Sequence, residues 1–181
     1  MAIDNEKMKT ADYLFTWSSN PKTGWPSAKL AELIDRFQRD GVAEEPWRCL
    51  ARTKIKPGDR AYFLKQGRPR IGIFGRGTVI DTPRRDSDGH QRRPGERPWR
   101  VRIRIEKLVD PRVEFFVDEG GLNRLSAPRA RWRTQASGIR LEDKAAREID
   151  AIIDGKDNEV SRFKKDASRE VARQQKLGQQ A

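Results

Sequence analysis

Residues 99–108, with the sequence WRVRIRIEKL, alternate strictly between apolar and charged side chains. Val101, Ile103 and Ile105 share one side of a β-strand with this period. The other side carries Arg100, Arg102 and Arg104. The pattern predicts a half-buried strand with a cationic outer face. A sheet built from such strands has to cover its apolar face with helices or close on itself.

The rest of the chain supplies partners for this strand. Alternation and turn residues predict strands over residues 12–18, 60–65 and 71–80, and a strand or single turn over 113–117. Apolar residues at helical spacing predict helices over residues 26–41 and 141–153, and a further helix over 158–177. Residues 47–51 form a short apolar run, and residues 81–97 a long polar loop. This order predicts an α+β fold, with an open curled β-barrel of five to six strands flanked by helices and a C-terminal helical extension.

A chain of 181 residues has the length of one domain with an appendage. Residues 1–10 are polar and are expected to form a flexible N-terminus. We place the domain at residues 11–154. Residues 155–181 have balanced charges and a glutamine-rich end, which predicts a helical tail or linker.

Positive charge is concentrated in the middle of the sequence. The chain carries a formal net charge of +12, and residues 46–141 hold 24 basic and ten acidic residues. Arginine outnumbers lysine two to one, and arginine suits bidentate contacts with phosphate and stacking on flat rings. A polyanion, with nucleic acid ahead of a membrane or an acidic protein, is the predicted partner. A basic surface that serves only solubility is the alternative.

The composition excludes several classes of protein. Cys49 is the only cysteine and His90 the only histidine, which excludes disulfide frameworks, cysteine-rich zinc sites and paired-histidine metal sites. Asp81, Asp86 and Asp88 near His90 lack matching ligands elsewhere, so a metal-dependent hydrolase is disfavoured. We expect no catalytic residue, metal or cofactor. The sequence contains no apolar run that could span a membrane and no signal peptide, so a cytosolic protein is expected.

The five tryptophans, Trp17, Trp25, Trp47, Trp99 and Trp132, fall at the ends of predicted elements or in loops. They could be half-buried anchors at the rim of the barrel. Alternatively, two or three of them could converge on a slot for a flat ring, since a base stacked on an aromatic side chain gains roughly 1–3 kcal/mol.

Several short motifs resemble EVE domains, the PUA-like relatives of YTH domains. The motifs are YLFTWSSNP at residues 13–21 with Trp25, WRC at 47–49, KPGDR at 56–60, GIFGRG at 72–77 and WRTQASGI at 132–139. Their order and spacing cover about residues 11–154. The resemblance implies a PUA-like curled sheet and a pocket that accepts a base rotated out of its strand. It also implies a module of the type found in bacterial modification-dependent HNH restriction endonucleases, although this chain lacks the histidines of an HNH motif.

Carried over residue by residue, the resemblance implies that Trp17 to Pro21 form the polar edge of the pocket, and Trp25 and Trp47 its walls. Trp99 is a looser match to a further cage position, and residues 133–138 would clamp the backbone phosphate. The expected pocket is Trp17, Ser18, Ser19, Asn20, Trp25, Trp47, Trp99, Gln135, Ser137 and Gly138. The expected contacts with the nucleic-acid backbone are Arg48, Arg52, Lys54, Arg68, Arg70, Arg84, Arg85, Arg92, Arg93, Arg97 and Arg133.

Hydrogen-bonding side chains in these motifs suit the edge of a base. Ser18, Ser19, Asn20 and Gln135 supply donors and acceptors, and Asp12 could accept from an exocyclic amine. Ser-Asn-Pro is equally an ordinary turn. The resemblance to EVE domains implies a reader of double-stranded DNA that contains 5-methyl- or 5-hydroxymethylcytosine. It is expected to act in the bacterial cytoplasm with a fused or partner nuclease. An RNA-binding PUA- or YTH-like module that recognises a methylated RNA base is the alternative, and a protein-interaction domain is the third class.

Overall fold

The computed structural model describes residues 10–20, 25–50, 53–85, 95 and 97–155. Within them, eight strands form one mixed sheet, whose main path runs β2-β6-β4-β3-β1-β8. The five longer strands are β1 (Asp12–Ser18), β2 (Ala43–Arg48), β3 (Arg60–Gln66), β4 (Gly72–Val79) and β6 (Trp99–Leu108). The two-residue strands are β5 (Arg84–Arg85), β7 (Val117–Asp118) and β8 (Ile139–Arg140).

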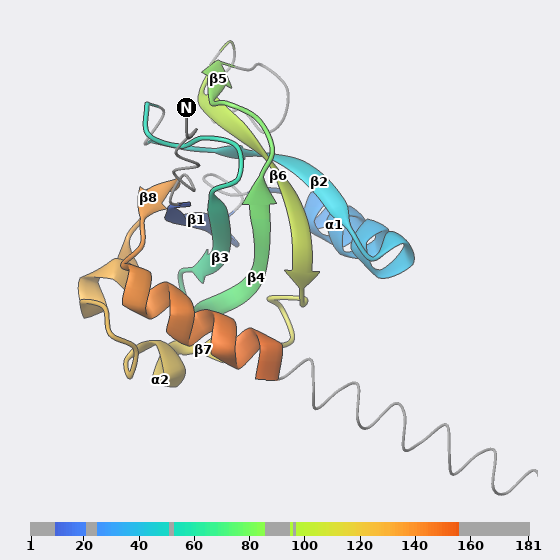
Figure 1. Cartoon of the computed structure of the whole chain (residues 1–181). Coiled ribbons are helices and arrows are strands. Elements are labelled where there is room, and N and C mark those ends of the chain that lie inside the picture. The colour runs from blue at the N-terminus through green and yellow to red at the C-terminus, as the bar shows by residue number, and fades with distance from the viewer. Residues whose placement is uncertain (1–9, 21–24, 51–52, 86–94, 96, 156–181) are drawn as a thin grey trace, which may run out of the picture.

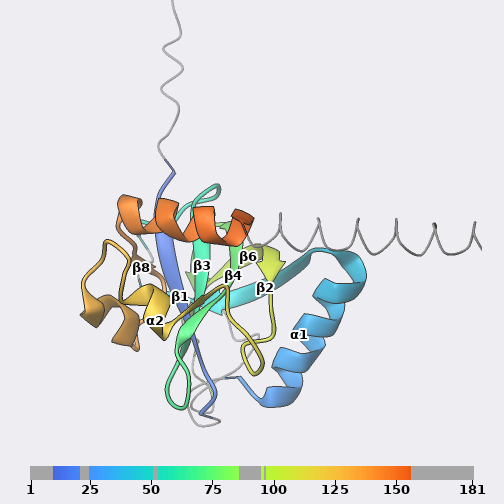
Figure 2. The same ribbon diagram turned by 90° about the horizontal axis from the view of Figure 1, so that it is seen from below.

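Helices pack on both sides of the curled sheet. Helix α1 (Ser27–Asp40) lies beyond β2 and β6, and the helix over residues 143–155 crosses the opposite face, as Figures 1 and 2 show. Two short helices, α2 (Glu119–Leu122) and η1 (Arg129–Arg133), follow β7. The sheet and its helices confirm the predicted α+β fold. The predicted C-terminal extension lies outside the described residues from residue 156 onward.

Alternating residues of the central strands enter two separate cores. In β1, Phe15 belongs to the core shared with α1, whereas Leu14 belongs to the core under the helix of residues 143–155. In β3, Phe63 belongs to the core shared with α1, and Tyr62 belongs to the core under the helix of residues 143–155. Both cores are needed because apolar side chains on both faces of these strands must leave water.

The parallel pairing of β1 with β3 brings two strand ends together. The register runs from Asp12 opposite Arg60 to Ser18 opposite Gln66, so both strands end at the same edge of the sheet. A turn before β3 fixes its start, since the buried Asp59 carboxylate accepts the backbone N–H groups of Ala11 and Lys56, each at 2.9 Å. This places the polar segment after Ser18 beside the turn that follows Gln66.

Strand β2 begins before the apolar run over residues 47–51. Ala43, Glu45 and Trp47 all point inward and are buried. Glu45 interrupts the apolar pattern in the sequence, but Lys29 and Arg36 of α1 pair with its carboxylate at 2.7 and 2.9 Å. A charge that is satisfied by a neighbouring helix can therefore occupy an inward strand position.

Within the described part of the chain, no helix combines the length and the apolar character that are needed to cross a membrane.

Candidate functional site

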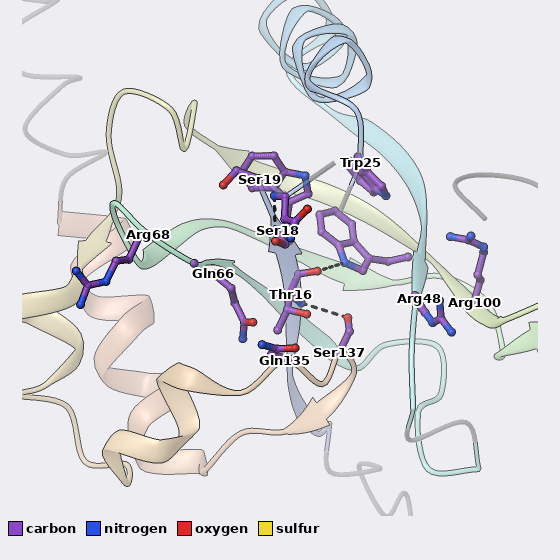
Figure 3. Close-up of a pocket in the computed structure, with 14 residues that line it drawn as sticks. Thr16, Ser18, Ser19, Trp25, Arg48, Gln66, Arg68, Arg100, Gln135 and Ser137 are labelled. Atoms are coloured by element: carbon purple, nitrogen blue, oxygen red, sulfur yellow. Dashed lines mark hydrogen bonds between the residues drawn. The ribbon is translucent and has the colours of Figure 1, made fainter. Parts of the chain in front are cut away.

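A cavity of about 510 Å³ opens at the edge of the sheet where β1 and β3 end. The adjoining ends of β2 and β6 form another part of its wall, because Arg48 lies opposite Arg100 in their antiparallel register. Figure 3 shows the side chains around it. The lining consists of Thr16, Trp17, Ser18, Ser19, Asn20, Trp25, Trp47, Arg48, Gln66, Gly67, Arg68, Arg100, Gln135 and Ser137.

The aromatic part of the wall is continuous with the core. The ring centroids of Trp25 and Trp47 lie 4.4 Å apart, and Trp47 stacks on Phe63 at 4.5 Å with a 28° angle between the rings. Trp47 is 3% exposed, and its Nε1–H donates to the Thr16 carbonyl at 3.1 Å. Trp47 is thus a fixed support that holds Trp25 in place. Trp17 is a further aromatic residue of the lining.

The indole Nε1–H of Trp17 and the amide Nε2 of Gln66 are buried donors of lining residues and have no hydrogen-bond partner among the described residues. These two residues are 4% and 8% exposed. A buried donor without an acceptor costs roughly 1–3 kcal/mol. A bound molecule that reached these groups would supply the missing acceptors. Ser137 adds a hydroxyl that already accepts the Thr16 N–H at 3.2 Å and can still donate its own proton.

Three arginines give the cavity a positive charge. Arg48 and Arg100 lie on one side and Arg68 on the other (Figure 3), and no carboxylate of the described residues is part of the lining. Guanidinium groups on both sides of an opening suit a strand of phosphates that passes over it.

The structure brings eight of the predicted pocket residues together in this cavity, and two lie elsewhere. Trp99 packs at the edge of the α1 core, with the Arg85 guanidinium 5.4 Å from its ring centroid. Gly138 has φ +70°, and a Cβ there would lie 2.6 Å from the Cβ of Cys49. Glycine is needed at this position for backbone conformation and close packing. Asp12 is also remote from the cavity, because it is buried and paired with Arg60 at 2.7 Å.

The predicted backbone contacts are spread over several parts of the surface. Arg48 and Arg68 line the cavity. Lys54, Arg70, Arg84, Arg85, Arg97 and Arg133 are exposed. Arg70 donates to the Val113 carbonyl at 2.8 Å, which ties it to the loop before β7. Arg52, Arg92 and Arg93 lie outside the described residues.

The cavity also contains residues that were not among the predicted site residues: Thr16, Gln66, Gly67 and Arg100. Gln66 had a usable signal, since it is the last residue before a glycine turn that follows a buried strand. The alternation predicted that the Arg100 side chain faces solvent. This prediction is wrong, because Arg100 is only 3% exposed. β2 and β5 pair with β6 on its two sides at this residue, so strand neighbours flank Arg100 on both edges.

Two shifted pKa values near the cavity have structural causes. Burial raises the pKa of the Cys49 thiol to about 11, so this side chain stays protonated at neutral pH and is a poor nucleophile. Burial, with a smaller contribution from Arg70, lowers the pKa of Lys65. In the described ranges no group of three or more His, Cys, Asp or Glu residues could hold a metal ion. Asp86, Asp88 and His90 of the disfavoured hydrolase hypothesis lie outside these ranges.

No protein-family model and no curated protein matches this sequence. Solved structures are similar to it in fold. A protein from Pseudomonas putida is 16% identical, with 78% of this chain and 99% of that chain covered and a TM-score of 0.50. A hypothetical protein from Leishmania major is 12% identical over 82% and 98% of the two chains, with a TM-score of 0.49. Human THYN1, solved in complex with DNA that contains 5-methylcytosine, is 13% identical over 77% and 95%, with a TM-score of 0.48. The similarity to the Pseudomonas putida protein shows a shared fold, and the curled mixed sheet with its flanking helices is the predicted α+β architecture.

Proposed function

We propose that this chain reads modified cytosine in DNA, 5-methyl- or 5-hydroxymethylcytosine, by taking the base out of the duplex into the cavity beside Trp25. The observation that carries the proposal is the combination of groups in one cavity of about 510 Å³. The cavity has an aromatic border, and the buried donors of Trp17 and Gln66 have no partner among the described residues. Three arginines also line it, without a lining carboxylate from those residues.

Each group has a role in the proposed complex. The edge of cytosine presents N3 and O2 as acceptors, to which the Gln66 amide and the Trp17 indole can donate. The Gln135 amide oxygen can accept from the exocyclic amine. Stacking contributes about 1–3 kcal/mol per base, which offsets much of the few kcal/mol that unstacking costs. Arg48 and Arg68, on opposite sides of the cavity, contact phosphates that flank the base.

The direct test compares matched duplexes by fluorescence anisotropy at one fixed salt concentration, since phosphate contacts make affinity depend steeply on salt. The human THYN1 complex supplies the first probe, a duplex with 5-methylcytosine. Duplexes with 5-hydroxymethylcytosine and with unmodified cytosine, and matched RNAs with and without a methylated base, complete the set. Preference for a modified DNA duplex is expected. Equal binding to modified and unmodified DNA would refute the proposal that the chain reads a modified base in DNA. Preference for the methylated RNA would support the RNA-binding alternative.

Base rotation has a separate readout. A 2-aminopurine placed next to the modified cytosine should gain fluorescence on binding, because its stacking neighbour leaves the helix. Trp25→Ala should remove this gain and reduce the preference for the modified base by about tenfold, in line with the loss of one stacking contact. Trp99→Ala is the matched control, since this tryptophan lies outside the cavity lining. Circular dichroism checks that both variants fold. An equal effect of the two substitutions would place the base elsewhere.

We also propose that this recognition serves a modification-dependent restriction system in a bacterial cytoplasm, in which the chain provides specificity and a fused or partner nuclease cuts the DNA. The support is the resemblance of the motifs at residues 13–21, 47–49, 56–60, 72–77 and 132–139 to EVE domains, which implies a module of the type found in modification-dependent restriction endonucleases. The chain, together with the nuclease encoded with it, should lower the transformation of methylated but not unmethylated plasmid. Equal transformation of both plasmids would contradict this role.

A further inference from the structure

A second cavity, of about 460 Å³, adjoins the first. Its lining is Gly67, Arg68, Pro69, Ile71, Glu119 and Arg133. Gly67 and Arg68 belong to both cavities. The two cavities therefore lie on either side of one short stretch of chain, the turn between β3 and β4.

This turn is held rigidly. The buried Lys65 ammonium donates to the carbonyls of Gly67 and Arg70 at 3.3 and 2.6 Å, so it closes the turn from inside. Gly67 has φ +80°, and no atom of the described residues lies within 4 Å of a Cβ placed on it. A backbone without a side chain at this point leaves room for another chain to approach closely. The turn can therefore act as a fixed partition between two neighbouring ligand groups.

The second cavity combines cationic, apolar and acceptor groups. Arg133 projects from η1 with 75% of its side chain exposed, and the Glu119 carboxylate lies 3.7 Å from its guanidinium. Pro69 and Ile71 form the apolar part. This set differs from the first cavity, whose lining has no carboxylate from the described residues. Guanidinium groups suit phosphate, and a carboxylate suits an amino group on a base.

We propose that the second cavity is a subsite for the nucleotide adjacent to the one in the first cavity. The phosphate between the two nucleotides lies over Gly67 and contacts Arg68, and Arg133 contacts the next phosphate. Glu119 accepts a hydrogen bond from the exocyclic amino group of the neighbouring base, so cytosine or adenine is preferred there to thymine. The subsite deepens the proposed function and rests on it, since it presupposes a DNA strand with one base in the first cavity.

The test measures preference for the neighbouring base separately from preference for the modification. Duplexes carry 5-methylcytosine, or cytosine as the reference, and vary the adjacent base on each side among C, A and T. The wild-type chain should bind duplexes with C or A on one side about tenfold more tightly than the duplex with T, the usual size of one base-edge hydrogen bond. Glu119→Gln should reduce this ratio to less than about threefold and leave the ratio of modified to unmodified DNA unchanged.

Arg133→Ala should weaken binding to every duplex about fivefold, whatever the adjacent base, and should lower the slope of log affinity against log salt by about one. Arg129→Ala, an equal loss of charge on the same η1 helix outside both cavities, is the matched control. Glu114→Gln is the control for Glu119→Gln, since Glu114 is exposed and outside the cavity.

The outcomes separate the two proposals. If the chain does not prefer modified DNA, the proposed function fails. The chain could prefer modified DNA while the adjacent base has no effect and Arg133→Ala and Arg129→Ala lower DNA affinity equally. That result would refute the subsite and leave the proposed recognition of modified cytosine intact. If Glu119→Gln strengthens binding to all duplexes equally, Glu119 only repels phosphate, and its role in base selection is overturned.

Discussion

Arg60 and Arg76 lie beneath the helix of residues 143–155, whereas Arg48 and Arg68 line the cavity. Arg60 contacts Asp12 and Asp150 at 2.7 and 2.5 Å. Arg76 contacts Asp150 at 2.8 Å and Asp154 at 2.9 Å. The cavity that Arg48 and Arg68 line has no lining carboxylate from the described residues.

The difference shows how one residue type serves two purposes in a basic chain. Asp150 comes from the helix, whereas Arg60 and Arg76 come from β3 and β4, so these ion pairs fasten the helix to the sheet. The hydrogen bonds to Asp12 and Asp154 hold the same guanidinium groups in place. At the cavity, positive charge collects where no acidic side chain of the described residues lines the wall, which favours an anionic ligand.

The largest effect is expected from breaking the helix attachment. Asp150→Ala removes the shared partner of Arg60 and Arg76, and its side chain is only 17% exposed. We expect the free energy of unfolding to fall by about 3 kcal/mol, measured by urea denaturation, because two charged hydrogen bonds are lost at a partly buried site. Asp154→Ala, at a side chain that is 56% exposed, should cost less than about 1 kcal/mol. Similar losses in both variants would mean that Asp150 does not anchor the helix.

A smaller effect, on binding instead of stability, is expected at the cavity. Arg68→Ala should weaken DNA binding about tenfold in anisotropy titrations and leave the urea midpoint within error, since its side chain is exposed and its role is phosphate contact. Arg68→Lys should recover only part of the loss, because lysine cannot make a bidentate contact. Full affinity in Arg68→Ala would remove the contrast between the two groups of arginines.

The ion pair between Asp110 and Arg112 should make the stability of the fold depend on pH in acid. The hydrogen bonds from Arg112 hold the pKa of Asp110 below its ordinary value. A carboxyl whose folded pKa is lowered stabilises the fold above its unfolded pKa, and that contribution is lost as the pH falls through the folded pKa. Stability should therefore decline below about pH 4, with Asp110→Asn less sensitive to acid than the wild type by up to about 1 kcal/mol. The urea midpoints of the wild type and of Asp110→Asn at pH 7 and pH 3 measure this difference. An equal decrease in both proteins would contradict the prediction.

The smallest effect is expected where a paired arginine is exposed. Arg104 on β6 contacts Glu44 on β2 at 3.2 Å, and both side chains are about half exposed. Arg104→Ala should change the free energy of unfolding by less than about 0.5 kcal/mol, because an exposed ion pair contributes little. DNA affinity should change less than about twofold, since Arg104 lines neither cavity. A large loss of affinity would extend the DNA-binding surface to the outer face of β6.

Local sequence patterns predicted most of the helices and strands, because the periodic spacing of apolar residues that forms them is visible within each segment. The alternation in residues 99–108 fixed β6, and the apolar spacing between Pro26 and Gly41 fixed α1. Gly41 ends that helix with φ +71°. Strand β2 was harder to predict, because the partners of buried Glu45 come from α1 and are not visible in the strand's own pattern.

The residues of the candidate site that lie in the motifs could be predicted from the sequence. Those whose position depends on strand pairing or tertiary packing could not. The segment Trp17 to Asn20, Trp25, Trp47 and Gln135 carried recognisable residue types, and all of them line the cavity. Arg100 had the period of an outward side chain, yet β2 and β5 flank it on both edges. Trp99 had a suggestive position at the start of a strand, but packing directs it to another part of the surface.

The sequence by itself determined the α+β element order, the confinement of positive charge to residues 46–141 and the aromatic segments beside polar stretches. The tertiary structure decided which arginines fasten the helix of residues 143–155 to the sheet and which line a cavity. It also placed two cavities on either side of the turn at Gly67 and Arg68. The physical reason is that burial and ion pairing depend on residues distant in the sequence, such as Arg60 and Asp150, whereas periodicity depends only on neighbours.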